Sequence, residues 1–218
     1  MVTTLYLIRH GETEGADAPS YKGTIDVPLS ENGMKQMKLV ARYIVQHYSK
    51  LNNIELSNRI GPSKLSAVYC SDLSRAVRSA EIIAEPHGLI PVIITEIRER
   101  NFGIWEGMAF TEIKEKYPTE FESWTNNPLK YSPIGGESTL AIKERVMEGL
   151  DRILNNHHGE NIAVVSHGGV NRIILCHFLG MPLENIFRIE QDYGALNIIE
   201  LWDKYLVVKL INGIISSS

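Results

Sequence analysis

The sequence has little that would connect it to a membrane or to nucleic acid. No hydrophobic run among the 218 residues is long enough to span a bilayer. The N-terminus carries no basic segment followed by an apolar one, so we expect no secretory signal. The formal net charge is −4 at pH 7, which argues against a general binder of nucleic acid or anionic membranes. We therefore expect no nucleic-acid partner and no membrane, whereas a small anionic substrate stays possible because a pocket can be positive in a mildly acidic protein.

Cysteine is scarce, because Cys70 and Cys176 are the only two. Neither belongs to a Cys-x-x-Cys pair, so the sequence predicts neither a zinc site nor a disulfide framework. Two unpaired cysteines fit a reducing compartment, and we expect the cytoplasm.

Apolar residues make up 44% of the chain and charged residues 22%, as in ordinary globular proteins. Segments with strand and helix patterns alternate along the sequence, which predicts an α/β fold with a mostly parallel central sheet and helices on both faces. Expected strands cover residues 4–8, 66–71, 91–94 and 161–166, and residues 195–211 predict a hairpin that turns at 203–204. Expected helices cover residues 30–48, 72–88, 135–153 (opened by residues 135–138) and 170–179, with residues 49–65 as a loop or insertion.

Nothing in the sequence resembles a linker between independent domains, so we expect one domain over residues 1–218. Residues 100–134 contain two short helical patterns interrupted by Pro118 and Pro128, which predict a helical insertion covering one face. Its aromatic residues are expected to form the insertion's own core rather than a binding surface.

The first expected strand ends in Arg9, His10 and Gly11. Ligands of open α/β sheets bind outside the carboxyl ends of the strands, so these side chains would face a crevice. Arginine offers a planar fork for phosphate or carboxylate, and histidine can act as base, nucleophile or metal ligand near neutral pH. The alternative is a strand that simply ends in polar residues at the surface.

A second strand ends in the same way, because residues 161–166 are followed by His167, Gly168 and Gly169. Glycines at the start of a helix leave its amide groups open to an anion. A further arginine, Arg75, falls in the first turn of a helix for which Asp72 is the expected N-cap. A cation there opposes the helix dipole unless an anionic ligand is present, although a solvated surface arginine is the simpler alternative. Together these residues suggest an anion pocket around a reactive imidazole.

Residues 7–13, Leu-Ile-Arg-His-Gly-Glu-Thr, resemble the signature of the histidine phosphatase superfamily, which includes the cofactor-dependent phosphoglycerate mutases. Residues 23–30, 71–76, 99–103 and 166–169 resemble its later motifs, in the family's order. The resemblance covers nearly the whole chain and implies the three-layer fold of the phosphoglycerate mutases.

The resemblance also implies a role for each matched residue. His10 would attack phosphorus and become a phosphohistidine, while Arg9, Arg75 and His167 would hold the phosphoryl oxygens. Glu99 would protonate the leaving group and later activate water; it is preferred to Glu96 and Glu106 by alignment alone. Arg75 is preferred to Arg78 because residues 71–76 match the motif there. The family implies neither a divalent cation nor a cofactor.

Three residues are expected to contact substrate: Lys22, Gly23 and Gly168. For Lys22, a solvated loop lysine is an equally good interpretation.

The acceptor of the phosphoryl group divides the family into phosphatases and mutases. Mutases resemble one another in an arginine-rich stretch of the insertion. In this sequence, Lys130 is the only basic residue between positions 120 and 134. Ala16 and Lys22 also stand where mutases tend to have asparagine and threonine. Residues 102–107 and 135–138 look more like the small bacterial phosphatases, including the α-ribazole phosphatases. We therefore expect a metal-independent phosphomonoesterase acting on a small phosphorylated metabolite, for which α-ribazole phosphate is one option.

Two other functions remain open at this point. One is a phosphoglycerate mutase, and the other is a catalytically silent protein that binds a phosphorylated ligand on the same fold. The sequence does not fix the oligomeric state, and the C-terminal strands and residues 49–65 are candidate surfaces for a homodimer.

Overall fold

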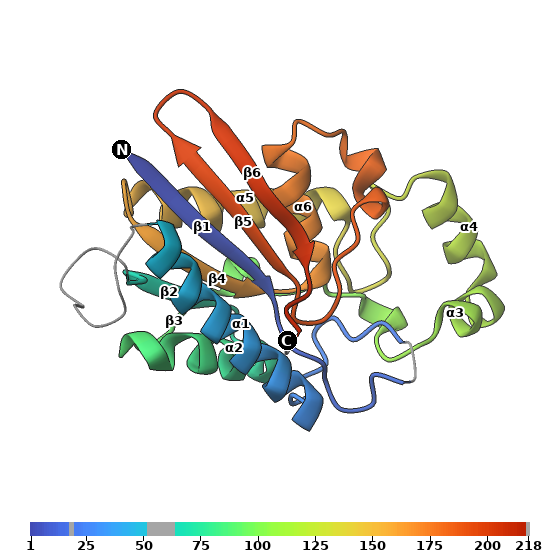
Figure 1. The fold of residues 1–218 in the computed structure, drawn as a ribbon. Coiled ribbons are helices and arrows are strands. Elements are labelled where there is room, and N and C mark those ends of the chain that lie inside the picture. Colours follow the sequence, from blue (N-terminus) through green and yellow to red (C-terminus); the bar gives the residue numbers. More distant parts are fainter. Residues whose placement is uncertain (18–19, 52–63, 217–218) are drawn as a thin grey trace.

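The structure is a computed structural model, and it describes residues 1–17, 20–51 and 64–216. A twisted six-stranded sheet runs through the molecule in the order β3-β2-β4-β1-β5-β6 (Figure 1). Its strands are β1 (Val2–Arg9), β2 (Ala67–Cys70), β3 (Val92–Ile93), β4 (Asn161–Ser166), β5 (Leu196–Trp202) and β6 (Leu206–Gly213). The strands from β3 to β1 are parallel, while β5 and β6 are antiparallel to their neighbours.

Helices cover both faces of the sheet (Figure 1). One face carries α1 (Glu31–Leu51) and α2 (Ser74–Ala84), and the other carries α5 (Thr139–Asn155) and α6 (Gly168–Phe178). The helices α3 (Phe110–Lys116) and α4 (Pro118–Asn126) extend from one end of the molecule. Short 3₁₀ helices lie in the connections, at Glu85–His87, Thr95–Ile97, Gly103–Trp105 and Leu183–Arg188. Among the described residues, no helix is both long and apolar enough to cross a membrane.

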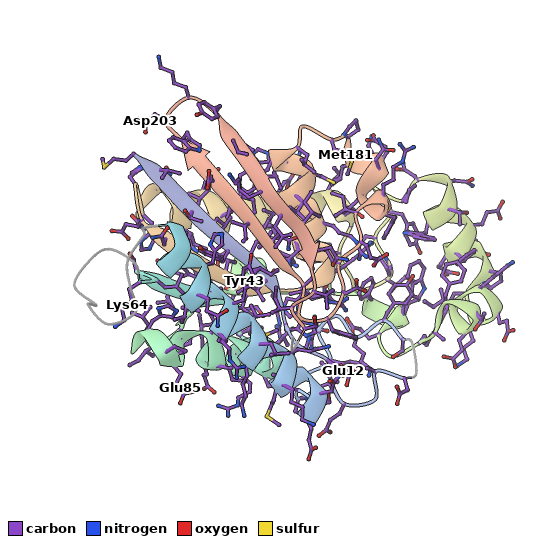
Figure 2. The ribbon with its side chains drawn as sticks, viewed as in Figure 1. Glu12, Tyr43, Lys64, Glu85, Met181 and Asp203 are labelled. Carbon is purple, nitrogen blue, oxygen red and sulfur yellow. The ribbon has the colours of Figure 1, made fainter. Side chains whose placement is uncertain are left out.

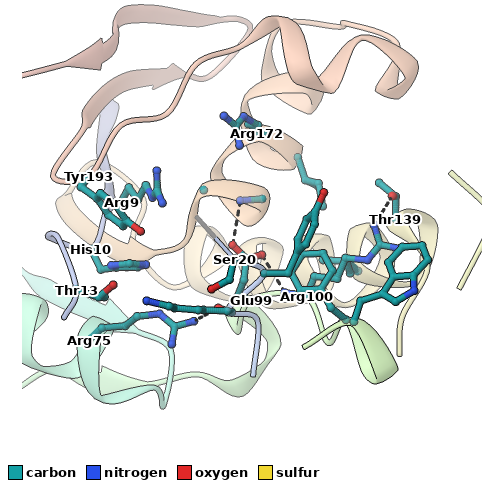
Figure 3. A pocket seen from close by; sticks show the side chains of 18 of the residues that line it. Arg9, His10, Thr13, Ser20, Arg75, Glu99, Arg100, Thr139, Arg172 and Tyr193 are labelled. Atoms are coloured by element: carbon teal, nitrogen blue, oxygen red, sulfur yellow. Dashed lines mark hydrogen bonds between the residues drawn. The ribbon is translucent and has the colours of Figure 1, made fainter. Parts of the chain in front are cut away.

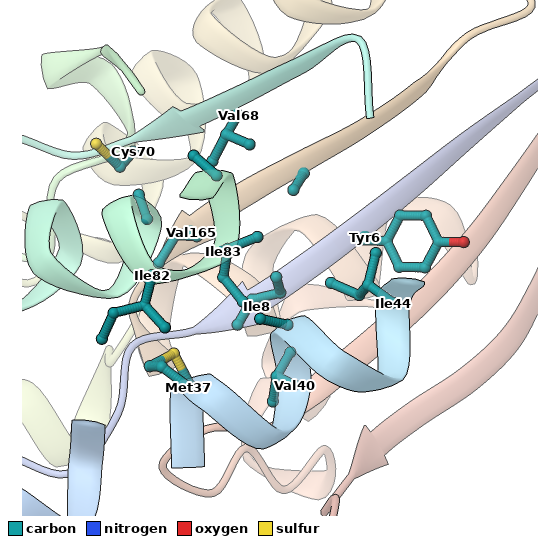
Figure 4. Packing of buried hydrophobic residues seen from close by; sticks show 14 of the residues in the cluster. Tyr6, Ile8, Met37, Val40, Ile44, Val68, Cys70, Ile82, Ile83 and Val165 are labelled. Atoms are coloured by element: carbon teal, nitrogen blue, oxygen red, sulfur yellow. The ribbon is translucent and has the colours of Figure 1, made fainter. Parts of the chain in front are cut away.

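The sheet separates two hydrophobic cores, and side chains fill the space on both of its faces (Figure 2). In the first core, Met37, Val40 and Ile44 of α1 pack against Tyr6 and Ile8 of β1 (Figure 4). In the second core, α5 and α6 pack against the opposite face of the same strands. Because β1 is covered on both faces, its residues from 3 to 8 are all buried, and its sequence is a nearly continuous apolar run.

The main features expected from the sequence are present. The mostly parallel sheet has helices on both faces, and the C-terminal strands form an antiparallel hairpin. Ser30 caps α1, because its hydroxyl accepts the Gly33 amide at 3.0 Å. The third strand is shorter than residues 91–94, since β3 contains only Val92 and Ile93.

Two local predictions are wrong. Asp72 is not the N-cap of α2. The N-cap position is Leu73, whose side chain cannot accept a hydrogen bond from the helix. Asp26 from a distant loop takes over, accepting both the amide and the hydroxyl of Ser74 at 2.9 and 2.7 Å. The loop expected from residue 49 also starts later, since α1 continues to Leu51; residues 52–63 of that segment lie outside the described residues.

Candidate active site

Three parallel strands end side by side and bring three polar residues together. In the register of the sheet, Arg9 is paired with Ser166, so the residues that follow, His10 and His167, become neighbours. Their ring centroids are 5.1 Å apart. Ser71 follows β2 on the other side of β4, and its hydroxyl lies 2.6 Å from His167 Nε2. The strand ends therefore create the polar centre that the sequence predicted.

His10 is buried and held in one orientation. Its Nδ1 lies 2.7 Å from the Gly11 carbonyl oxygen, so Nδ1 carries the proton and Nε2 keeps a lone pair in the neutral ring. Burial, together with the nearby charges of Arg9 and Arg75, holds the pKa of His10 well below its ordinary value. A neutral imidazole with a free Nε2 is the form that a nucleophilic histidine needs.

His167 is fully buried beside His10, and burial again lowers its pKa well below the ordinary value. Its Nδ1 has no hydrogen-bond partner among the described residues, and neither has Nε of Arg9. Unpartnered buried nitrogen atoms cost free energy, so both would gain from a bound oxyanion.

Arg9 is fixed at the end of β1 from two sides. Its Nη1 donates to the Gln191 carbonyl oxygen at 2.6 Å, and its guanidinium lies 4.0 Å from the centre of the Tyr193 ring. The same tyrosine ring is 5.7 Å from that of His10. Tyr193 therefore supports the cation from the loop before β5, through a cation–π contact.

Arg75 is not the solvated surface residue that the sequence left open, since only 2% of it is exposed. Its guanidinium donates to three carbonyl oxygens of the 22–25 loop, those of Lys22, Gly23 and Ile25, at 2.7–3.0 Å. In contrast, Arg78 is exposed and forms an ion pair with Glu81. Arg75 is thus the arginine of α2 that reaches the pocket.

Glu99 lines the cavity and lies between Arg75 and Arg100 (Figure 3). Its two carboxyl oxygens accept the amides of Arg100 and Gly169 at 2.9 and 3.1 Å. A Cβ at Gly169 would lie 2.6 Å from Oε1, so any side chain there would displace the carboxyl group from this position.

The two acidic alternatives occupy other places. Glu96 forms an ion pair with Arg152 at 2.6 Å. Glu106 accepts the amides of Gly23, Thr24, Ile25 and Phe102, and the Thr24 hydroxyl, at 2.9–3.3 Å. It therefore ties the loop that holds Arg75 to the loop that carries Glu99.

The expected substrate-binding residues are only partly gathered. Lys22 and Gly168 line the pocket, whereas Gly23 does not belong to the lining among the described residues. Lys22 Nζ donates to the carbonyl oxygens of Glu14 and Gly15. Gly23 is needed for packing, because a Cβ there would lie 1.9 Å from the Arg100 carbonyl oxygen.

The cavity has a volume of about 620 Å³ and two chemically different parts. Arg9, His10 and Arg75 gather at one end, and Arg100 lies toward the other (Figure 3). Among the described residues, six aromatic side chains also line it, namely Tyr21, Phe102, Trp105, Trp124, Phe187 and Tyr193. The insertion's aromatic residues do form their own cluster, as expected, through contacts such as Phe110 with Phe121. Trp124 nevertheless serves both the cluster and the cavity, which the sequence did not indicate.

Several residues of the site had no clear signal in the sequence. Tyr193, Glu106 and Arg172 act through contacts between segments that are far apart along the chain. Among the described residues, no group of three or more His, Cys, Asp or Glu side chains is arranged to hold a metal ion.

Comparison with known proteins agrees with this geometry. Residues 5–213 match the family model of the histidine phosphatase superfamily (branch 1). The chain is 31% identical to phosphoserine phosphatase 1 of Hydrogenobacter thermophilus, over 95% of this chain and 91% of that protein. It is 28% identical to the adenosylcobalamin/alpha-ribazole phosphatase of Escherichia coli, over 96% and 95%.

A solved structure of the same kind is similar throughout. The alpha-ribazole phosphatase from Shigella flexneri superposes with a TM-score of 0.81 at 26% identity, covering 99% of this chain and 98% of that one. The chain belongs to branch 1 of the histidine phosphatase superfamily and is a phosphatase.

Proposed function

We propose that this phosphatase hydrolyses a small phosphomonoester through a phosphohistidine formed on His10, without a metal ion. The observation that carries the proposal is the neutral His10 ring, whose Nε2 remains free beside two unpartnered buried nitrogen atoms, Arg9 Nε and His167 Nδ1.

In the first step, His10 Nε2 attacks phosphorus and the bond between phosphorus and the ester oxygen breaks. Glu99, protonated at this stage, gives its proton to the departing alkoxide. Arg9, Arg75 and His167 hold the three non-bridging oxygens, whose charge is spread in the transition state. In the second step, water attacks phosphorus while the bond between phosphorus and His10 Nε2 breaks, Glu99 takes the water proton, and inorganic phosphate leaves.

The first test is hydrolysis of p-nitrophenyl phosphate across pH 5–8 in excess EDTA, for wild type and His10→Ala. We expect activity that tolerates EDTA and is lost in the variant. Acid-labile phosphate found on His10 by rapid quench and mass spectrometry would support the intermediate. Full activity of His10→Ala would overturn the mechanism.

For the physiological substrate, α-ribazole phosphate is one candidate. Relatives from Escherichia coli and Salmonella typhimurium carry that activity in their names, and the aromatic part of the cavity suits an aromatic or apolar leaving group. Phosphoserine is a second candidate, since the relative from Hydrogenobacter thermophilus is a phosphoserine phosphatase. A panel of phosphorylated metabolites, scored by kcat/KM, decides between them.

Two alternatives are tested in the same assays. Transfer of phosphate between the positions of phosphoglycerate, rather than its release, would show a mutase. Binding of phosphorylated ligands with neither turnover nor phosphate on His10 would show a silent binding protein.

We also propose a cytoplasmic location, supported by the two unpaired and buried thiols of Cys70 and Cys176. A homodimer is a further proposal. Light scattering coupled to size-exclusion chromatography would test it, and a single species with the mass of one chain would exclude it.

A further inference from the structure

In the part of the chain that the structure describes, five arginine and lysine side chains line the cavity against a single acidic one, Glu99. They are Arg9, Lys22, Arg75, Arg100 and Arg172. A phosphate group does not need all five, and the proposed function uses only Arg9 and Arg75. The remaining three differ in what their nitrogen atoms already bind.

Lys22 and Arg100 are engaged by the protein itself. Lys22 Nζ donates to two carbonyl oxygens. Arg100 is held through Nε, Nη1 and Nη2 by the Glu137 carbonyl, the Thr139 hydroxyl and the Tyr131 carbonyl. Both side chains therefore serve to fix loops.

Arg172 is held on one edge only. Its Nε donates to the Ile189 carbonyl oxygen at 2.7 Å, and its Nη2 lies 3.1 Å from a carboxylate oxygen of Glu190. These two bonds fix the guanidinium plane, while Nη1 has no hydrogen-bond partner among the described residues. The Glu190 side chain is 70% exposed, so water screens its negative charge. The ion pair therefore neutralises Arg172 only weakly, and the guanidinium can still attract an anion.

The free edge of Arg172 lies next to the phosphate end of the cavity. Arg172 follows Gly168 by one helical turn on α6, so both residues lie on the same face. A Cβ at Gly168 would lie 3.6 Å from Arg172 Nη1 and 3.5 Å from Arg9 Cζ, so the two guanidinium groups flank this glycine. Figure 3 shows Arg172 above the cavity, away from Arg100.

We propose that Arg172 binds a carboxylate carried by the alcohol part of the substrate, within a few bonds of the ester oxygen. The planar fork of a guanidinium is suited to a carboxylate, and the fixed plane reduces the entropy lost on binding. This inference rests on the proposed function and narrows its substrate class to phosphorylated hydroxy acids or amino acids. It would supply from α6 the carboxylate-binding cation that residues 120–134 lack.

Matched esters test this directly. 3-Phosphoglycerate and glycerol 3-phosphate differ only by a carboxylate in place of a hydroxymethyl group, three bonds from the ester oxygen. We expect wild type to prefer 3-phosphoglycerate at least tenfold in kcat/KM, and Arg172→Gln to bring that ratio close to one. Arg78→Gln removes an exposed arginine of α2 that is outside the cavity lining, and should keep the wild-type ratio. Glu190→Gln removes the competing carboxylate and should raise the ratio.

Other outcomes would overturn the inference. A wild-type ratio near one, or equal losses on both esters in Arg172→Gln, would show that Arg172 does not recognise the carboxylate.

α-Ribazole phosphate, which has no carboxylate, should rank below 3-phosphoglycerate. Circular dichroism of each variant checks that it is folded, and Arg172→Lys, which keeps the charge but not the fork, should give an intermediate ratio.

Failure of the proposed function would be separable. Calorimetry measures the affinity for each of the two esters, so it reports the preference for the carboxylate even if neither ester is hydrolysed. A protein that binds 3-phosphoglycerate selectively through Arg172 but hydrolyses no phosphomonoester would contradict the proposed function and support this inference.

Discussion

At the scale of single residues, the site depends on small groups placed where nothing larger fits. Gly169 has its amide on one Glu99 oxygen, and an added Cβ would lie 2.6 Å from the other. Gly11 is needed for space rather than for an unusual backbone angle, because a Cβ there would lie 2.4 Å from the Gly33 carbonyl oxygen. The sequence places both glycines in motifs, but only the structure shows which neighbour each one admits.

We predict that Gly169→Ala impairs the general acid. The added methyl group displaces the Glu99 carboxyl, so the loss should be greatest where the leaving group needs a proton. We expect kcat for an alkyl phosphate to fall about 100-fold, with a much smaller change for p-nitrophenyl phosphate, whose leaving group is already acidic. Equal losses on the two substrates would contradict this assignment of Glu99.

We predict a second effect at Tyr193, whose ring lies 4.0 Å from the Arg9 guanidinium. Tyr193→Leu removes the cation–π contact and should lower kcat/KM by about 3- to 30-fold, corresponding to roughly 0.5–2 kcal/mol. Tyr193→Phe keeps the ring and is the matched control. If the phenylalanine variant lost as much as the leucine variant, the hydroxyl rather than the ring would be the active part.

At the scale of elements, the sequence predicts what is periodic and misses what is paired across loops. The apolar stripe of α5 repeats at helix spacing, and β1 and β4 are short continuous apolar runs, so the positions of these elements follow from pattern. The cap of α2 by Asp26 joins residues 48 positions apart, and no local signal encodes it. The same holds for Glu106, whose bonds to the 23–25 loop place the carbonyl groups that hold Arg75.

The short 3₁₀ helix after α2 gives a prediction about pH. His87 is 3% exposed, and burial, with a contribution from Lys64, lowers its pKa to about 4. Between about pH 4 and 6.5, the unfolded chain therefore binds a proton at His87 that the folded chain does not bind. Its contribution to the free energy of unfolding is fully present above pH 6.5 and is lost as the pH falls toward 4, by about 3 kcal/mol in all.

Urea denaturation of wild type and His87→Leu between pH 4 and 7.5 would measure this contribution. The wild-type free energy of unfolding should fall more steeply with decreasing pH than that of the variant, by up to about 1.4 kcal/mol per pH unit. His10 and His167 contribute equally to both proteins, so the difference isolates His87. Parallel curves would show that His87 does not titrate in this range.

At the scale of the whole molecule, the sheet carries the site at one end of its strands and a core on each face. The α/β class follows from the alternation of patterns, and the family's motifs identify the residues at the strand ends. The order of the strands does not follow from either, because β4 lies between β2 and β1 although it comes more than 90 residues after β2. That order is what places His167 next to His10, and it is set by long-range packing.

Because the same sheet contributes side chains to the cores on both of its faces, we predict that the two cores unfold together. Ile44 and Leu150 are fully buried on opposite faces, so Ile44→Ala and Leu150→Ala should each cost about 2–5 kcal/mol of stability. The two side chains belong to different cores, so the double variant should show the sum of the two costs within about 0.5 kcal/mol. Near- and far-ultraviolet circular dichroism should give coincident transitions for each single variant. A variant in which one face melts before the other would show that β1 and β4 do not couple the two cores.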